Sequence, residues 1–354
     1  MIASKRKAIQ KEAIVKVFQV EDDWTLDNVR IGERPKPEPA AGQVRIKMTA
    51  SALNYRDLII PQRGYGKRMQ ELPLVMLSDG VGTIDAIGPG VTRVKAGDRV
   101  CPIFYQSWIN GEPHNERFRF SLGCEQDGTM AEYLVLSEEG VSLVPEHLSD
   151  TEAATLPTAA VTAWRTLVTE GKVKPGETVL VQGTGGVSLF ALQFAKILGA
   201  RVIITSSSDD KLARARALGA DATINYVQDP QWGIRARDIA GGRGVDHVVE
   251  VGGAGTLPQS LRAVRTGGTI SMIGVLAGSD LSVPLGQIVT RHIRLQGITV
   301  GSRDDFEAMA AAVSLHTLRP VVDQVFAFDE LRAALEYIRS GKHFGKICIR
   351  HALT

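Results

Sequence analysis

The sequence has few cysteines, no large excess of either charge and no long hydrophobic run. Its three cysteines, Cys101, Cys124 and Cys348, lie far apart in the chain, so we expect neither a disulfide framework nor a structural zinc cluster. A net charge of +2 gives no reason to expect nucleic acid or an acidic membrane as a partner. No apolar run approaches the length of a membrane span and the N-terminus has no signal-peptide core, so we expect a cytoplasmic protein.

The composition is ordinary for a folded globular chain. Apolar residues make up 44% of the sequence and charged residues 23%. A chain of 354 residues is expected to form two domains. Residues 1–12 are basic and have no hydrophobic pattern, with Lys5, Arg6 and Lys7 in succession. We expect these residues to form a solvated tail.

The N-terminal 150 residues consist mostly of short stretches that are typical of half-buried strands. In residues 43–52, for example, Val44, Ile46 and Met48 alternate with other residues. Prolines at three positions in residues 35–39 indicate an extended connector. The pattern predicts a β-rich, partly barrel-like domain with strands at residues 14–20, 43–52, 80–87, 97–103 and 130–136.

From residue 151 onward, strand-like runs alternate with helical ones. Residues 152–170 have helical spacing, and Thr151 is the expected N-cap. The alternation that follows indicates a parallel sheet covered by helices on both faces. The expected strands are residues 179–181, 202–205, 223–225, 245–251, 269–275 and 295–300.

The C-terminal segment is expected to pack back on the first domain. It contains helical patterns at residues 306–315 and 331–340 and strand patterns at residues 326–328 and 346–349. The β-rich domain would therefore be discontinuous. We predict that it comprises residues 1–158 and 304–354, and that the α/β domain comprises residues 159–303.

A glycine-rich turn in residues 178–221 is the strongest functional signal. A buried strand is followed at once by a turn and by a helical pattern that ends at Gly199. Strand, glycine turn, helix and strand in succession indicate the first half of a dinucleotide-binding fold, in which phosphates bind the free N–H groups at the helix start. The alternative is a glycine turn without a ligand, because Ser188 replaces the third glycine of the usual motif. The predicted phosphate-binding residues are Gly183, Thr184, Gly185, Gly186 and Val187.

The end of the second strand predicts which coenzyme binds. NAD sites usually carry Asp or Glu there to hold the ribose 2′-hydroxyl, but this sequence has Ser206 and Ser207, with Lys211 one helical turn further. Hydroxyls and a cation without a carboxylate suit a 2′-phosphate, so we favour NADPH. In the alternative interpretation, Ser208 or Asp209 caps the next helix and Lys211 is solvated.

Several motifs together resemble the medium-chain dehydrogenase/reductase superfamily, and more narrowly its zinc-independent quinone oxidoreductase branch. The resemblance extends from about residue 13 to the C-terminus. It implies a doubly wound Rossmann sheet of α/β class beside a discontinuous, β-rich GroES-like domain. The motifs are ALNYRD at residues 52–57, RGY at 63–65, SDGVG at 78–82, GDRV at 97–100, GTMAEY at 128–133, the glycine turn and GK at 345–346.

The sequence departs from the zinc alcohol dehydrogenases at the positions that hold their catalytic metal. Where these relatives carry Cys, His and Cys, an alignment by eye gives Asn54, Ser78 and Thr158. Amide and hydroxyl oxygens are poor zinc ligands compared with thiolate and imidazole. We therefore expect no metal, although a zinc alcohol dehydrogenase with unusual ligands is one alternative.

Without a Lewis acid to stabilise an alkoxide, the hydride acceptor must already be electron-poor. A quinone or an α,β-unsaturated carbonyl meets this requirement, and the resemblance implies the same: NADPH-dependent reduction of quinones or activated C=C bonds. A second alternative is a non-catalytic NADPH-binding sensor or structural protein, because fold does not determine function.

The predicted catalytic residues are Asn54, Tyr55 and Tyr65. Asn54 would face the nicotinamide or the substrate, or else be a turn residue. Tyr55 or Tyr65 could donate a proton or hydrogen bond to the developing oxyanion, or could simply pack. Asp57 is expected to be structural, and Asp79 to hold the geometry of the cleft.

The resemblance also implies further coenzyme contacts and a homodimer that pairs through the region of residues 281–299. A polar loop at residues 106–121 would tune substrate access. The seven histidines, His343 included, form no ligand-like spacing and are interpreted as incidental. The implied coenzyme-binding residues are Asn54, Thr158, Thr162, Tyr226, Gly252, Gly274, Leu276, Arg303 and Lys346.

Overall fold

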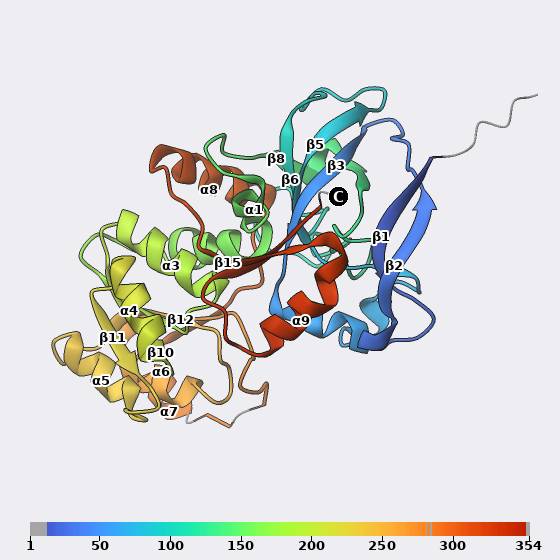
Figure 1. Cartoon of the computed structure of the whole chain (residues 1–354). Helices are drawn as coiled ribbons and strands as arrows, with labels where there is room; N and C mark the ends of the chain where they lie inside the picture. The colour runs from blue at the N-terminus through green and yellow to red at the C-terminus, as the bar shows by residue number, and fades with distance from the viewer. Residues whose placement is uncertain (1–12, 281, 284, 352–354) are drawn as a thin grey trace, which may run out of the picture.

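The computed structural model describes residues 13–351 except 281 and 284. Residues 1–12, predicted as a basic tail, lie outside this part of the chain, as do two positions of the predicted pairing region. The described elements form two large sheets, each with its own helices, and a small third sheet (Figure 1). None of the helices in this part of the chain combines the length and apolarity needed to cross a membrane.

A six-stranded parallel sheet forms the α/β half of the molecule. Its strand order, β11-β10-β9-β12-β13-β14, is that of a doubly wound dinucleotide-binding fold, with a change of direction between β9 and β12. The strands are β9 (Thr178–Gln182), β10 (Arg201–Ser206), β11 (Ala222–Asn225), β12 (Val245–Glu250), β13 (Val264–Met272) and β14 (Arg294–Gly297). The helices of this half are α3 (Gly186–Ile197), α4 (Asp209–Ala217), α5 (Trp232–Ile239), α6 (Leu257–Ala263) and α7 (Leu285–Thr290).

The β-rich half contains a seven-stranded sheet in the order β15-β16-β3-β5-β6-β8, with β7 paired to β3. β1 pairs with β2 and β4 in the small third sheet. Among the described residues the seven-stranded sheet does not close into a ring. The strands are β1 (Ile14–Val20), β2 (Val29–Pro35), β3 (Gln43–Ala52), β4 (Leu74–Val75), β5 (Asp79–Ile87), β6 (Arg99–Pro102), β7 (Tyr133–Ser137), β8 (Val141–Leu143), β15 (Val322–Ala327) and β16 (Lys346–Arg350).

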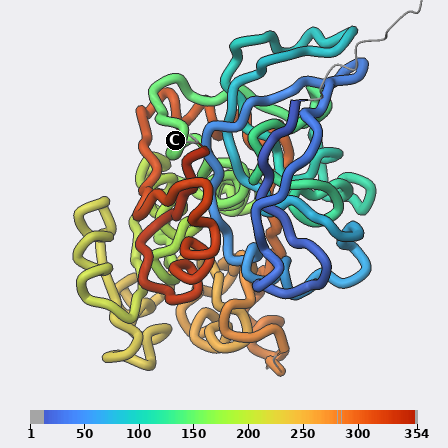
Figure 2. Tube along the Cα trace, turned by 45° about the vertical axis from the view of Figure 1, so that its right-hand side comes forward, coloured from blue at the N-terminus to red at the C-terminus, as the bar shows by residue number. Residues whose placement is uncertain are grey.

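The C-terminal segment returns to the β-rich half, as expected. β16 pairs antiparallel with β3, so that Cys348 lies opposite Ala52, and Figures 1 and 2 show the red C-terminal ribbon beside the blue strands. Helix α9 (Leu331–Arg339) buries Leu331, Ala334, Leu335 and Ile338 at helical spacing, while α8 (Arg303–Leu315) buries Phe306, Met309 and Val313. The predicted α/β class is thus confirmed, whereas the numerical domain boundaries stay a prediction.

A helical connector joins the two halves. It comprises α1 (Asp150–Ala153), a π-helical turn η6 (Leu156–Ala160), α2 (Val161–Trp164) and a second π-helical turn η7 (Arg165–Thr169). Its N-cap is Ser149, not the predicted Thr151. Ser149 accepts a hydrogen bond from the Glu152 N–H and donates its own N–H to the Glu152 carboxylate, which is the capping box of a Ser-x-x-Glu sequence.

Short 3₁₀ turns complete the described structure. Three of the described strands, β2, β4 and β8, were not predicted. Residues 35–39 were predicted as a connector, and β2, which ends at Pro35, was not recognised. Because β2 pairs with β1 along its whole length and is mostly half-buried or exposed, its hydrophobic pattern is weak. The 3₁₀ turns are η1 (Leu26–Asn28), η2 (Tyr55–Leu58), η3 (Ile60–Gln62), η4 (Gly66–Arg68), η5 (Glu138–Gly140) and η8 (Phe328–Glu330).

Candidate active site

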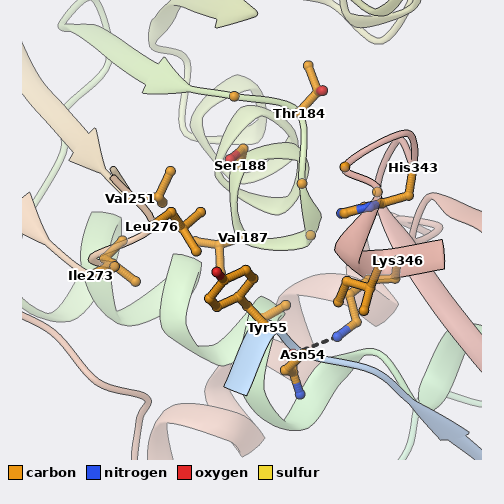
Figure 3. A pocket seen from close by; sticks show the side chains of 18 of the residues that line it. Asn54, Tyr55, Thr184, Val187, Ser188, Val251, Ile273, Leu276, His343 and Lys346 are labelled. Carbon is orange, nitrogen blue, oxygen red and sulfur yellow. Dashed lines mark hydrogen bonds between the residues drawn. The ribbon is translucent and has the colours of Figure 1, made fainter. Parts of the chain in front are cut away.

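A cleft of about 430 Å³ lies at the carboxyl ends of β9 and β12, where the strand order changes direction. Ligands bind at this position in open α/β sheets. Figure 3 shows side chains entering the cleft from the glycine turn, from the segment after β3 and from the start of β16. The predicted residues that line it are Asn54, Tyr55, Thr158, Thr162, Gly183, Thr184, Gly185, Gly186, Val187, Ser206, Ser207, Lys211, Tyr226, Gly274, Leu276 and Lys346.

The glycine turn presents open backbone to the cleft. Gly183 has a φ of +69°, which favours glycine, and a methyl group on Gly185 would meet no heavy atom within 4 Å. Gly185 is the N-cap of α3, whose first N–H groups are free to bind an anion. Ser188 fills the position of the third glycine, and its hydroxyl donates to the Gln182 carbonyl at 2.7 Å. The turn therefore fits the pyrophosphate of a dinucleotide.

Ser206, Ser207, Lys211 and Tyr226 form one end of the cleft, which we call the outer end. It carries hydroxyls and one lysine. Lys211 donates to the Gly341 carbonyl at 2.7 Å, and burial lowers the pKa of its ammonium. Asp209 is turned away from the cleft, because its carboxylate accepts hydrogen bonds from Asn225 (2.8 Å) and Gln228 (2.9 Å). No Asp or Glu of the described residues lines the cleft. Ser208 also caps α4 through the Lys211 N–H, so the capping interpretation holds for Ser208.

The inner end of the cleft is formed by Asn54 and Tyr55. The Asn54 carbonyl oxygen accepts a hydrogen bond from the Lys346 ammonium at 2.7 Å, while its amide nitrogen is buried and has no hydrogen-bond partner among the described residues. Tyr55 is 50% exposed and lines the same cleft as Val187 and Leu276 (Figure 3). The Tyr55 phenol therefore borders the cleft beside the glycine turn, whereas the Asn54 side-chain nitrogen is buried.

Beneath Asn54 lies a buried ion pair. The Lys346 side chain is 4% exposed and its ammonium lies 3.7 Å from the carboxylate of Asp79, which is fully buried. Ser78 and Thr158 both donate their hydroxyls to this carboxylate. The three positions aligned with zinc ligands thus meet around Asp79. Lys346 does line the cleft, but its ammonium is directed at Asn54 and the Leu53 carbonyl.

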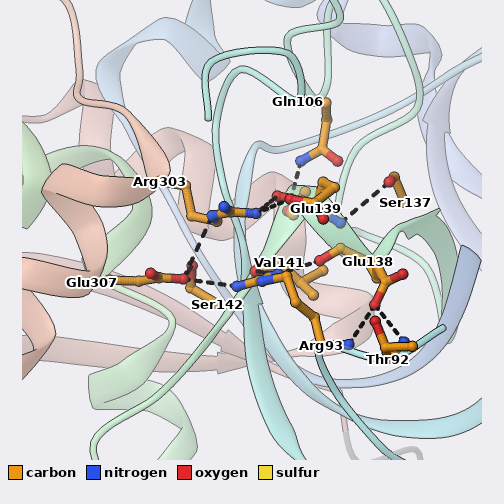
Figure 4. Close-up of polar contacts among 11 residues, drawn as sticks. Thr92, Arg93, Gln106, Ser137, Glu138, Glu139, Val141, Ser142, Arg303 and Glu307 are labelled. Carbon is orange, nitrogen blue, oxygen red and sulfur yellow. Dashed lines mark hydrogen bonds and ion pairs between the residues drawn. The ribbon is translucent and has the colours of Figure 1, made fainter. Parts of the chain in front are cut away.

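Three predicted site residues do not line the cleft. Arg303 begins α8, where its guanidinium pairs with Glu139 and Glu307, so it joins surface elements instead of reaching the coenzyme (Figure 4). Gly252 is buried, and its N–H donates to the Glu250 carboxylate at 2.9 Å. Tyr65 packs its ring against Arg56, 5.5 Å from the guanidinium carbon, outside the cleft.

Asp57 has the structural role that was expected. Its carboxylate accepts the Asn54 backbone N–H at 2.7 Å at the start of η2. The side chain is fully buried, and desolvation raises the pKa of Asp57 to about 6. The carboxylate therefore fixes the backbone of Asn54 and does not enter the cleft.

Two residues that line the cleft, His343 and Arg56, were not predicted as site residues. His343 lies beside the glycine turn (Figure 3), and burial lowers the pKa of its imidazole. The available signal was its position two residues before the GK motif, not its spacing from other histidines. Arg56 donates to the Leu122 carbonyl at 2.9 Å and belongs to the ALNYRD motif.

Comparisons with known proteins agree with this geometry. The family model "Alcohol dehydrogenase GroES-like domain" matches residues 40–146, and "Zinc-binding dehydrogenase" matches residues 186–314. The "Zinc-type alcohol dehydrogenase-like protein C1773.06c" of Schizosaccharomyces pombe is 45% identical over 87% of this chain and 91% of its own. The chain belongs to the medium-chain dehydrogenase/reductase superfamily.

Two further relatives of this dehydrogenase/reductase differ in their chemistry. A solved NAD-dependent alcohol dehydrogenase is 33% identical, with a TM-score of 0.88 over 95% of this chain and 100% of that one. The acryloyl-coenzyme A reductase of Metallosphaera sedula is 30% identical over 90% of this chain and 95% of its own. The superfamily assignment therefore establishes an oxidoreductase with a nicotinamide-binding fold and leaves the substrate open.

The zinc named in one family model does not fit the residues of this dehydrogenase/reductase. The described residues contain no group of three or more His, Cys, Asp or Glu side chains placed to hold a metal. At the aligned positions two hydroxyls donate to Asp79, and the Asn54 oxygen faces an ammonium. A cation at this place would meet the charge of Lys346 and would lack thiolate or imidazole ligands.

Proposed function

We propose that this protein is a metal-free, NADPH-dependent reductase of α,β-unsaturated carbonyl compounds or quinones. One observation carries the proposal: a buried ion pair of Lys346 and Asp79 is hydrogen-bonded to Asn54, Ser78 and Thr158, the three residues that align with the zinc ligands of relatives. Without a Lewis acid, the acceptor must delocalise the charge of the incoming hydride by itself.

The proposal of NADPH rests on the outer end of the cleft. Ser206, Ser207, Lys211 and Tyr226 line it, and no Asp or Glu in the described part of the chain lines the cleft to compete for a ribose hydroxyl. Lys211 uses one N–H on a neutral carbonyl and keeps others for a phosphate. Because a 33% identical neighbour is NAD-dependent, coenzyme preference has to be measured directly.

The chain's residues would bind and orient both reactants. When bound, the reduced coenzyme supplies the hydride that adds to the β-carbon of the acceptor, and water supplies the proton for the α-carbon. At the inner end of the cleft, the Tyr55 hydroxyl is a donor available to the acceptor carbonyl oxygen, on which negative charge develops. The apolar side chains of Val187 and Leu276 would shield their side of the cleft from water.

The acryloyl-coenzyme A reductase relative supports an activated C=C bond as the reacting group. We also propose a homodimer. β14 is at the edge of its sheet in the described structure, and Leu285 and Val289 of the neighbouring α7 are 68% and 71% exposed.

The test is the oxidation of NADPH and of NADH by the purified protein with a panel of enones, quinones and saturated aldehydes, combined with metal analysis. We expect turnover of enones or quinones with NADPH and no stoichiometric metal. Tight NADPH binding without any turnover would instead indicate the non-catalytic sensor. Stoichiometric zinc together with alcohol oxidation would support the alternative of a zinc alcohol dehydrogenase with unusual ligands and would contradict the proposal.

A further inference from the structure

The loop between α9 and β16 brings His343 to the glycine turn. At one end of this loop, the Gly345 N–H donates to the Thr184 carbonyl at 2.9 Å, so the loop is hydrogen-bonded to the glycine turn itself. At the other end, the Gly341 carbonyl accepts a hydrogen bond from the Lys211 ammonium at 2.7 Å. His343 lies midway between these two contacts in the chain and lines the cleft. It is therefore held between the glycine turn and the outer end of the cleft.

The next residue, Phe344, anchors the loop. Its side chain is buried in the same core cluster as Phe190 of α3, and the guanidinium carbon of Arg214 lies 4.0 Å from the centre of its ring. His343 itself is only half-buried, and Figure 3 shows its imidazole projecting from the loop toward the glycine turn. The anchored loop thus presents this side chain to the cleft.

The imidazole of His343 makes no hydrogen bond within the described part of the protein. Its Nδ1 is buried without a partner, although buried polar atoms of folded proteins normally have one. Nε2, at the far end of the ring, is not buried in this way and is the nitrogen that can reach a ligand in the cleft. A half-buried imidazole without a protein partner is therefore available for a ligand.

The charges around the imidazole favour an anion beside it. Burial has the largest effect and lowers the pKa of His343, and Lys211 of α4 lowers it further. Lys346 of β16 acts in the same direction, whereas Asp323 of β15 opposes both lysines. The imidazole is therefore neutral near pH 7 and carries one N–H. The oxygens of a phosphate diester only accept hydrogen bonds, so a nitrogen that binds them carries the proton.

We propose that His343 binds the pyrophosphate of the coenzyme, with its Nε2–H donating to a phosphate oxygen. The free N–H groups at the start of α3 bind other oxygens of the same group. The pyrophosphate is common to NADH and NADPH, so this contact would serve both coenzymes, whereas Lys211 is assigned to the 2′-phosphate of NADPH alone. The inference requires a bound nicotinamide coenzyme and does not depend on which acceptor is reduced.

The experiment measures the dissociation constants of NADH and NADPH by fluorescence titration. His343→Ala should raise both constants by about 10-fold or more, because a hydrogen bond to a charged group is lost. His343→Gln should remain within about 3-fold of the wild type, since its amide N–H can take the position of Nε2. His343→Asn places its amide near the buried Nδ1 instead and should behave like His343→Ala. Lys342→Ala, at the exposed neighbouring residue, is the control and should change neither constant by more than about 3-fold.

Two comparisons separate this contact from other roles of the loop. A loss confined to NADPH would place the imidazole at the 2′-phosphate and would overturn the proposal, as would unchanged constants in His343→Ala or equal losses in His343→Gln and His343→Ala. The melting temperature of free His343→Ala should stay within a few degrees of the wild type, because the imidazole has no partner in the described protein; a large fall would indicate a structural role instead. A wild type that binds neither coenzyme would also overturn the inference, whereas a failure of the proposed reductase function alone would leave these binding constants unchanged.

Discussion

Among the described residues, Lys211 is the charged side chain that lines the outer end of the cleft, so its removal should show which coenzyme the protein prefers. Its ammonium is hydrogen-bonded only to a backbone carbonyl in the described structure. Arg214, one turn further along α4, instead stacks on Phe344 and pairs with Asp323. The two residues therefore differ in what they can offer a 2′-phosphate.

Lys211→Ala should weaken NADPH binding by about 1.5–3 kcal/mol, the value of a charge-assisted hydrogen bond, and barely affect NADH. Titrating both coenzymes by fluorescence measures this difference. Arg214→Ala is the matched control and should leave the NADPH/NADH ratio unchanged. Equal losses for both coenzymes in Lys211→Ala would mean that the 2′-phosphate binds elsewhere.

His351 makes the stability of the protein depend on pH. The imidazole is fully buried with Nε2 at 2.9 Å from the Ser51 hydroxyl, and desolvation lowers the pKa of His351 from 6.5 to about 4. The unfolded chain therefore binds more protons between these values. The stability contributed by neutral His351 is present above pH 6.5 and is lost as the pH falls through 4.

Between pH 6.5 and 4, His351 should lower the free energy of unfolding of the wild type by about 3 kcal/mol. His351→Gln should remove most of this pH dependence. Urea unfolding of the variant and the wild type at pH values on both sides of this window measures the change. Asp57, whose pKa is raised, has the opposite slope, so only the difference between the two proteins isolates His351. An exposed control, His114→Gln, should behave like the wild type. Equal slopes in His351→Gln and the wild type would contradict a neutral buried imidazole.

At the scale of elements, the glycine turn and α3 act as a unit. β9 delivers the turn to the sheet edge, and the buried face of α3 (Leu189, Phe190 and Phe194) holds the helix against the connector. The free N–H groups are positioned by this packing. Gly185 contributes only space, since nothing in the described protein lies within 4 Å of a methyl group added there.

Gly185→Val should therefore abolish binding of both coenzymes, by about 100-fold or more, without lowering the melting temperature of the free protein by more than a few degrees. Isothermal titration and thermal unfolding measure the two effects. Gly286→Ala, at another glycine with open surroundings, is the control. Normal coenzyme binding by Gly185→Val would place the phosphate cradle at another site.

At the scale of the whole molecule, the cleft depends on segments that are distant in the sequence. Asn54, Thr158, Gly185 and Lys346 come together because β16 pairs with β3 and also follows the Gly185–Gly345 bridge. Away from the cleft, the Arg303–Glu139 pair joins α8 to η5.

The oligomeric state is also a property of the whole molecule, and the proposed dimer depends on the edge strand β14. Leu295 lies in the edge strand β14 and is 38% exposed. Leu295→Arg should convert the expected dimer to a monomer, because an unpaired guanidinium would be buried between the copies. Light scattering after size-exclusion chromatography measures the mass. Leu315→Arg, at the exposed end of α8, should leave the dimer intact. A monomeric wild type would contradict the proposed assembly.

Local patterns in the sequence were sufficient for much of the fold. β1 and β3 have the predicted bounds, and the glycine turn was assigned to the correct strand and helix, because alternation and helical spacing are properties of neighbouring residues. Ser149 could also have been found, since Ser-x-x-Glu is a local capping signal. β2 could not, because its weakly apolar residues are stabilised by pairing with β1.

The sequence by itself determined the superfamily and the strand, glycine turn and helix that line the cleft, and it predicted that Asn54, Ser78 and Thr158 are unsuited to zinc, since each of these depends on residue type within a short motif. Only the tertiary structure decided that Lys346 lies beneath Asn54, that Arg303 turns away to Glu139 and that His343 enters the cleft. The direction of a long side chain depends on its tertiary partners, and the Asn54 partner of Lys346 is nearly 300 residues away in the sequence. It also depends on burial, which no local pattern encodes.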